Sequence, residues 1–274
     1  TSCTDEDSLS NPPTGNNDKT VFQFSVNMPE YTSVRTRAAI NENAVNDLWL
    51  MTFDANGLFI GRAHASLLSS NSNGTGTFQA NIPDDSRIIH LIANYSQWDS
   101  FDKRAAMQKD EREIIPSLSS SNLVFWGRQT ISSPSDSPNV TLYRNLAKVT
   151  IENEATNFEV TGYALCNYTS SGTVAPFNPS APTTPFTLID GKPTLPRNPI
   201  SKTDQNAADC NMEPKYMFEN ENFSNDQTYI ILKGKLAGKT EDLYYKIQLL
   251  DTDKNPYPVM RNYHYKIVIK SFSE

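Results

Sequence analysis

The residues best able to carry catalytic or metal chemistry are few in this chain of 274 residues, and they lie far apart. They are three histidines and three cysteines: His64, His90, His264, Cys3, Cys166 and Cys210. No HExxH, CxxC, GxSxG, GxGxxG or phosphate-loop pattern groups such residues. No pattern singles out a pair of acids for glycoside hydrolysis. The sequence therefore predicts no catalytic residue, no metal site and no bound cofactor.

Two further patterns suggest weaker chemistry. The segment DTDKNPYPVMRN at 251–262 begins like a calcium-binding loop. It lacks the glycine expected at the sixth position, and it ends on Asn262 where a bidentate glutamate is expected. We therefore interpret it as a hairpin loop joining two strands. Cys166 and Cys210 are able to pair only in an oxidising compartment and with suitable geometry, so their pairing stays open.

The N-terminal stretch TSCTDED stands above this background. Cys3 follows two small residues, as at the cleavage site of bacterial lipoprotein precursors, in which the cysteine becomes acylated. The acids at 5–7 are similar to the surface-export signal of Bacteroidetes lipoproteins. Residues 1–18 are polar and rich in proline, glycine and asparagine, so they bury too little to recover their ordering entropy. We interpret them as a flexible lipoprotein tether with its lipidation site at Cys3.

A second pattern is SVRTRAAINEN at 33–43, a polar loop with two arginines directly after the first predicted strand. An exposed loop of this kind is accessible to a trypsin-like protease. Arg35 and Arg37 are therefore candidate sites of proteolytic cleavage, although an ordinary solvated loop has the same composition.

The elements around these sites are predicted to be β-strands, because apolar and polar residues alternate along most of the chain. VFQFSVNM forms a strand that Pro29 ends, and its buried face carries Phe22, Phe24, Val26 and Met28. LWLMTFDANGLFIG is typical of a hairpin with Gly57 in its turn. The other strands are predicted at TFQANI, RIIHLIANY, LVFWGRQTI, VTLYRNLAKVTIENEA, FEVTGYALCNY, TYIILKGKL, DLYYKIQLL and RNYHYKIVIKSF, the last with His264 facing outward.

One helix is predicted, over residues 100–118, with Pro116 ending it. SSPSDSPN at 132–139 is typical of a boundary, and the proline-rich segment 169–215 of a long loop. Many short strands without a βαβ rhythm predict an all-β protein of two β-sandwiches. We expect a first domain over 19–138, containing the helix, and a second over 139–274.

The overall composition excludes other classes of protein. A content of 37% hydrophobic and 20% charged residues is that of a folded soluble protein. The net charge of −7 argues against a nucleic-acid partner. No apolar run approaches the ~18 residues that cross a bilayer.

The three tryptophans differ in their surroundings. Trp49 and Trp126 lie in apolar strand patterns and are expected in the core, whereas Trp98 has a polar context and is the tryptophan to inspect for exposure.

Three segments resemble the fimbrillins, the major fimbrial subunits of the Bacteroidetes. RTRAAINENAVNDLWLMTFDANGLFIG is similar to their N-terminal domain, in which an arginine loop precedes a strand and an F-D-x-x-G hairpin. LYRNLAKVTIEN is similar to the first strand of their second domain, and VMRNYHYKIVIKSF to their final strand. The resemblance runs from about residue 20 to the end of the sequence.

The resemblance implies two transthyretin-like β-sandwich domains, export as an outer-membrane lipoprotein, and cleavage in the arginine loop. Assembly with other fimbrial subunits would follow by insertion of a neighbour's strand. Cleavage after Arg37 or Arg35 would release both the lipidated tether and the strand VFQFSVNM, leaving an unpaired edge and an apolar groove. One cut would thus couple release from the membrane to competence for assembly.

The sequence departs from the family pattern after the final strand. A shaft subunit carries a C-terminal extension that donates a strand, whereas this sequence stops at SFSE. Shaft, anchor and tip positions therefore remain open. The main hypothesis is a non-enzymatic structural subunit of an adhesive surface fimbria. The alternative is a surface-anchored binding module, such as a tip adhesin or glycan-binding lipoprotein, that recognises host or bacterial surface ligands through exposed aromatic residues and the 169–215 loop.

Overall fold

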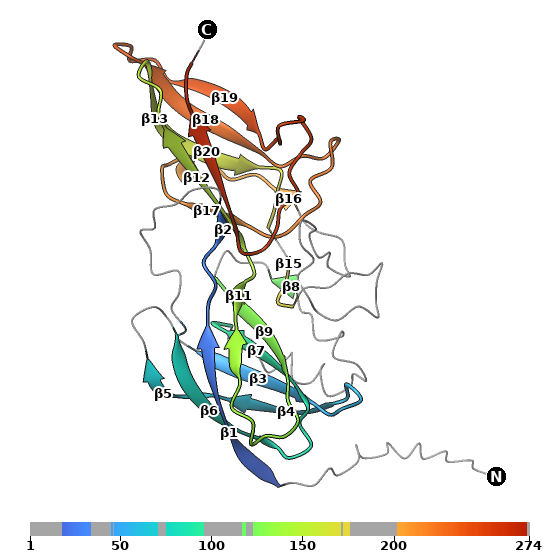
Figure 1. The fold of residues 1–274 in the computed structure, drawn as a ribbon. Helices are drawn as coiled ribbons and strands as arrows, with labels where there is room; N and C mark the ends of the chain where they lie inside the picture. Colours follow the sequence, from blue (N-terminus) through green and yellow to red (C-terminus); the bar gives the residue numbers. More distant parts are fainter. Residues whose placement is uncertain are drawn as a thin grey trace, which may run out of the picture.

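The computed structural model describes residues 18–33, 45, 47–70, 75–95, 117–118, 123–170, 172–175 and 202–272. Its regular elements are β-strands apart from one 3₁₀ turn at Ala207–Asp209, which confirms the predicted all-β class for the part of the chain described. The strands form two groups placed end to end along the molecule (Figure 1). Among the described residues, no helix has the length and apolar character needed to cross a bilayer.

The first group consists of two facing sheets, which we call the first sandwich. One sheet has the order β10-β1-β6-β5, and its strands are β1 (Lys19–Asn27), β5 (Ser66–Ser70), β6 (Gly76–Pro83) and β10 (Asn139–Thr141). The other has the order β11-β9-β7-β3-β4, and its strands are β3 (Leu48–Phe53), β4 (Phe59–His64), β7 (Ile88–Ala93), β9 (Phe125–Thr130) and β11 (Tyr143–Arg144). The predicted hairpin is present as β3 and β4, and Gly57 in its turn has a φ of 76°.

The second group, the second sandwich, is built in the same way from shorter sheets. One has the order β17-β12-β20-β2, with β2 (Thr32–Ser33), β12 (Ala147–Asn153), β17 (Lys215–Met217) and β20 (Tyr263–Ile269). The facing sheet is β13-β18-β19, with β13 (Phe158–Cys166), β18 (Tyr229–Leu236) and β19 (Leu243–Gln248). Two small ribbons complete the chain: β14 (Tyr168–Thr169) with β16 (Lys202–Thr203), and β15 (Gly172–Thr173) with β8 (Ser117–Leu118).

Each sandwich has its own apolar core, and a further apolar cluster packs between the two groups. The sheet that contains β3, β7 and β9 is buried on both faces, because one face covers the core of the first sandwich and the other carries Met51, Phe53 and Trp126. Val174 and Phe218, which come from beyond the first sandwich in sequence, pack onto that second face. Burial on both faces explains why β3 reads as the nearly continuous apolar run LWLMTF.

Strand pairing also shows where the chain passes from one group to the other. β10 was predicted to open the second domain, but it pairs with β1, and β11 pairs with β9. The passage therefore lies between Arg144 and Ala147, not at residue 138. In the opposite direction, β2 follows β1 directly in sequence yet pairs with β20 of the second sandwich. The N-terminal segment thus runs through both sandwiches (Figure 1).

Two local predictions need correction or fall in part outside the described residues. The segment 251–262 does not join two paired strands, because β19 and β20 lie in different sheets. Only an isolated antiparallel bridge between Leu250 and Pro256 gives its first part a hairpin-like form. The Asp251 carboxylate instead accepts the backbone amides of Asp253 and Asn255 and closes a turn. Of the predicted helix over 100–118, residues 100–116 lie outside the described part, and Ser117–Leu118 form β8.

Candidate strand-exchange site

The N-terminal strand fills the core of the first sandwich with its inward face. Phe22, Phe24 and Val26 are each at most 2% exposed, and Val21 and Gln23 on the other face are exposed, as the alternation predicted. The rings of Phe22 and Phe24 stack with centroids 5.1 Å apart, and Phe24 stacks on Phe78 of β6 at 5.9 Å. Burying three such side chains contributes about 5–9 kcal/mol, at about 1.5–3 kcal/mol each. Met28, the fourth predicted member, lies after the strand and is half-buried against the same core.

Both edges of β1 are hydrogen-bonded. It pairs antiparallel with β6 from Lys19 to Val26, and parallel with β10 over Ser25–Asn27. The Asn27 side chain fixes the shorter pairing, because its Nδ2 donates to Asn139 Oδ1 at 2.9 Å and its Oδ1 accepts from Thr141 Oγ1 at 3.2 Å. The strand is therefore internal to its sheet. Its departure would leave an apolar groove with two unpaired edges.

Beyond β1, the segment Pro29–Tyr31 crosses a polar junction between the sandwiches. Arg144 Nη1 donates to the carbonyl of Pro29 at 2.8 Å and to Asn262 Oδ1 at 2.9 Å. Asn262 Nδ2 donates in turn to the carbonyl of Glu30 at 3.2 Å. The guanidinium carbon of Arg144 lies 4.2 Å from the centre of the Tyr31 ring, and Lys148 Nζ lies 5.4 Å from it. We call Arg144, Lys148 and Asn262 the junction cluster.

Two members of the junction cluster belong to Arg-Asn dipeptides, one shortly before β12 and the other directly before β20. The first is Arg144-Asn145, and the second is Arg261-Asn262. Arg261 is 2% exposed; its Nε donates to Glu219 Oε1 at 2.7 Å and its Nη1 to the carbonyl of Val174 at 2.6 Å. Asn262 has a φ of 61°, a left-handed conformation that asparagine tolerates better than most residues.

Sequence reasoning used these dipeptides only as marks of resemblance and missed their structural role. The sequence did carry a sign of this role, because an Arg-Asn dipeptide occurs both in YRN and in MRN. Nothing local, however, tells that residues 118 positions apart meet at one point. His264, predicted to face outward, is also buried beside this point. It contacts Thr150 Oγ1 at 2.6 Å, and the Tyr31 ring packs against it with centroids 6.1 Å apart.

The other residues with possible chemistry are dispersed. His64 contacts Asp47, and His90 Nδ1 accepts from the Trp126 indole, so the three histidines have separate surroundings. Trp126 is in the core as predicted, and Trp49 is half-buried. Cys166 and Cys210 are both free thiols. Within the described residues, no three histidine, cysteine or acidic side chains are grouped so as to hold a metal ion. Cys3, Arg35, Arg37 and Trp98 lie outside the described residues.

Comparison with solved structures shows to which class of folds the chain belongs. The fold is similar to a putative cell adhesion protein from Parabacteroides distasonis, with a TM-score of 0.59 and 14% identity over 91% of this chain and 87% of that one. It is also similar to a fimbrial assembly protein from the same organism, with a TM-score of 0.58 and 15% identity over 94% of each chain. The C-terminally truncated tip fimbrial protein Mfa3 of Porphyromonas gingivalis gives 0.54 and 16% identity, covering 93% of this chain and 96% of that one. The fold is therefore that of Bacteroidales fimbrial and adhesion proteins.

Sequence comparison identifies a more similar relative of this chain. No protein-family model matches the chain. The chain is 34% identical over 266 residues to the major fimbrium tip subunit FimE of Porphyromonas gingivalis. The match covers 88% of this chain and 45% of FimE, so the chain spans a little under half the length of that relative. Together with the solved structures, this relationship confirms the resemblance to the Bacteroidetes fimbrillin family.

Proposed function

We propose that this chain is an adhesion-serving subunit of a cell-surface fimbria that assembles by strand exchange, and that it has no catalytic role. The precursor is anchored in the outer membrane by a lipid on Cys3. A protease cuts after Arg37 or Arg35 and releases the N-terminal strand, and a strand of another fimbrial subunit takes its place. Relatives whose names place them in fimbriae support the surface location and the kind of partner.

The observation that carries this proposal is the position of β1. The strand is the first of the described elements, it fills a groove with three fully buried side chains, and the segment with Arg35 and Arg37 follows it in sequence. The burial of about 5–9 kcal/mol is comparable with the whole stability of a typical domain, about 5–15 kcal/mol. A sandwich that has lost β1 therefore has a strong driving force to capture another strand through backbone pairing and apolar side chains.

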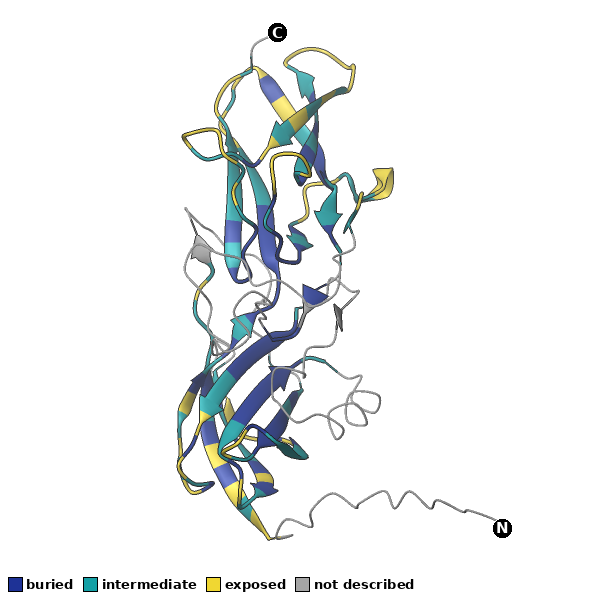
Figure 2. Cartoon of the chain, turned by 90° about the vertical axis from the view of Figure 1, so that its right-hand side faces the viewer, coloured by how far each residue is buried: buried dark blue, intermediate teal, exposed yellow. Residues whose placement is uncertain are grey.

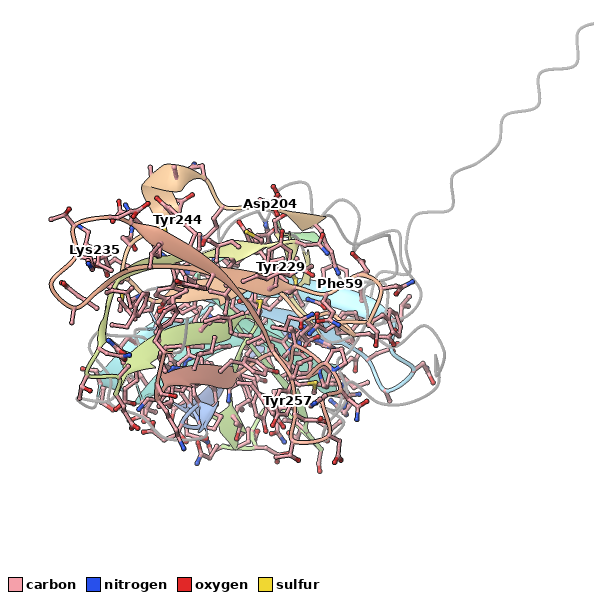
Figure 3. All side chains as sticks on the ribbon, turned by 90° about the horizontal axis from the view of Figure 1, so that it is seen from above. Phe59, Asp204, Tyr229, Lys235, Tyr244 and Tyr257 are labelled. Atoms are coloured by element: carbon pink, nitrogen blue, oxygen red, sulfur yellow. The ribbon has the colours of Figure 1, made fainter. Side chains whose placement is uncertain are left out.

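The second candidate function is a tip or anchor position with ligand binding instead of polymerisation. FimE and Mfa3 are named as tip proteins, which favours the tip. The surface offers exposed aromatic residues on the second sandwich, with Phe223 61%, Tyr244 59% and Tyr257 46% exposed. Viewed from above, Tyr244 and Tyr257 lie on different sides (Figure 3), so these two do not belong to one continuous stacking row. The described surface thus favours the structural role over a glycan-binding platform.

The test is the native N-terminus, measured by mass spectrometry of protein from cells and from isolated fimbriae. We expect acylated Cys3 in the membrane pool and a start at Ala38, or at Thr36, in the fimbriae. Replacing both Arg35 and Arg37 by alanine should keep the protein in the membrane pool, whereas Lys239→Ala, which removes a basic residue from an exposed turn, should leave processing unchanged. An intact N-terminus in assembled fimbriae would overturn the proposal.

A further inference from the structure

The N-terminal segment contacts both sandwiches, so the space it occupies is longer than the groove of β1. Its first part fills the first sandwich through Phe22, Phe24 and Val26. Its last part, Thr32–Ser33, pairs with Tyr263 and His264 of β20 in the second. Between them, the carbonyls of Pro29 and Glu30 accept hydrogen bonds from Arg144 and Asn262, and the Tyr31 ring lies on Arg144.

The junction cluster is buried beneath this segment. Arg144 is 2% exposed, and Lys148 and Asn262 are each 4% exposed. A cation that is shielded from water is stabilised by the electron-rich face of an aromatic ring, and here two cations lie close to one ring. Removal of the segment would take from Arg144 one carbonyl and one ring, and from Asn262 one carbonyl. The loss of a buried partner destabilises polar and charged groups wherever water does not replace it.

Resting on the proposed function, we propose that the junction cluster selects the incoming strand. The partner is an extended segment with three bulky apolar side chains in alternation, followed five residues after the third by an aromatic residue that lies between Arg144 and Lys148. The spacing is that from Val26 to Tyr31 in the native segment. A strand that fills the apolar groove but stops short of the junction binds weakly, and one with a lysine or arginine at the aromatic position is rejected.

The same contacts give the partner a second effect. Because the segment pairs with both sandwiches, a full-length incoming strand joins them, whereas a short one leaves the junction open. The aromatic residue therefore contributes to the rigidity of the assembled subunit as well as to recognition.

The main test uses synthetic peptides and the unaltered protein, so that it does not depend on the folding of a protein variant. The full chain is cut after Arg37 and incubated with fluorescent peptides of residues 19–33, and exchange into the cut protein is followed by anisotropy. Tyr31→Ala is expected to bind at least about tenfold more weakly than the native peptide. Tyr31→Phe keeps the ring and should bind within about twofold, and so should Val21→Ala, which alters a side chain that is 52% exposed.

The outcomes separate this proposal from the one on which it rests. If Tyr31→Ala binds as tightly as the native peptide while a Phe22→Ala, Phe24→Ala peptide binds weakly, strand exchange stands and selection by the junction is wrong. If no peptide exchanges, both proposals fall. Arg144→Ala in the cut protein provides an independent check, because it should reduce the difference between the Tyr31→Ala and native peptides.

Discussion

β1 and β20, the first and last strands of the described chain, differ in how deeply their inward side chains are buried. β1 pairs with β6 from Lys19 to Val26 and with β10 over Ser25–Asn27, and three of its side chains are fully buried. β20 pairs with β12 along Lys148–Asn153, but on its other edge β2 reaches only Tyr263 and His264. Within the described part of the chain, Tyr265–Ile269 has no strand on that edge.

The two cores differ accordingly. In the second sandwich the inward side chains of β19 and of the outer part of β20 are only half-buried; they include Tyr245, Ile247, Tyr265, Ile267 and Ile269. Figure 2 shows the contrast, with buried residues running along the strands of the first sandwich and many intermediate and exposed ones at the far end of the second. In the first sandwich, β1 thus fills the core with fully buried side chains. In the second, the outer part of β20 lies at an edge of its sheet within the described residues, and the core there is less deeply buried.

The largest expected loss of stability comes from removing the β1 side chains that fill the core of the first sandwich. Replacing both Phe22 and Phe24 by alanine should cost about 6–10 kcal/mol, since each Phe→Ala change in a core costs about 3–5 kcal/mol, with some non-additivity because the rings touch. The pair Ile267→Ala and Ile269→Ala should cost about 1–2 kcal/mol each, because these side chains are half-buried. Urea unfolding followed by tryptophan fluorescence measures the first change, since Trp49 and Trp126 lie in β3 and β9. Equal costs for the two pairs would show that the two cores are sealed alike.

A somewhat smaller effect concerns the salt bridge between Arg261 and Glu219, which anchors the start of β20. Both side chains are at most 5% exposed, so Glu219→Leu leaves a buried guanidinium without its carboxylate and should cost about 3–5 kcal/mol. Adding Arg261→Met should restore much of that loss, because replacing both charges removes the unpaired ion. As a control, Asp242→Asn disrupts the more exposed ion pairs of Lys233 and Lys235 and should leave the unfolding midpoint unchanged. A double variant no more stable than the single one would contradict this account.

These comparisons also show what the sequence could and could not predict. The alternation in VFQFSVNM predicted the buried face of β1, and the turn residues predicted the hairpin of β3 and β4, because each pattern is local. The burial of His264 could not be predicted in this way. Its cover comes from Tyr31 and β2, more than 200 positions earlier in the chain, and a period-two pattern gives no information about which face another segment will cover.

The same limit explains why the candidate site was predicted only in part. Apolar periodicity identified the groove residues of β1, since fully buried side chains leave a clear pattern. The junction cluster leaves no such pattern, because Arg144, Lys148 and Asn262 are polar residues that usually lie at the surface. Their burial depends on hydrogen bonds and ring contacts between segments 115 and 232 positions apart.

The smallest expected effect is a dependence of the unfolding free energy on pH, which tests how well the second sandwich excludes water. Burial raises the pKa of Tyr265 well above its ordinary value of about 10, and the hydroxyl donates to the carbonyl of Pro258 at 2.6 Å. Burial raises the pKa of Tyr163 in the same sandwich, where its hydroxyl lies 2.8 Å from the Glu213 carbonyl oxygen. Below pH 10 both residues keep their protons in the folded and the unfolded state, so they add no pH dependence there.

Above pH 10 the unfolded chain loses these protons while the folded one retains them, so the second sandwich should lose about 1.4 kcal/mol per pH unit for each tyrosine. Urea unfolding between pH 9 and 11, followed by far-ultraviolet circular dichroism, measures the slope. Tyr265→Phe should reduce it, and Tyr244→Phe, which alters a ring 59% exposed, should not. A slope unaffected by Tyr265→Phe would mean that this hydroxyl is open to water when the protein is folded. The edge of the second sandwich would then be looser than the packing of β20 indicates, and the contrast with the sealed core around β1 would be greater.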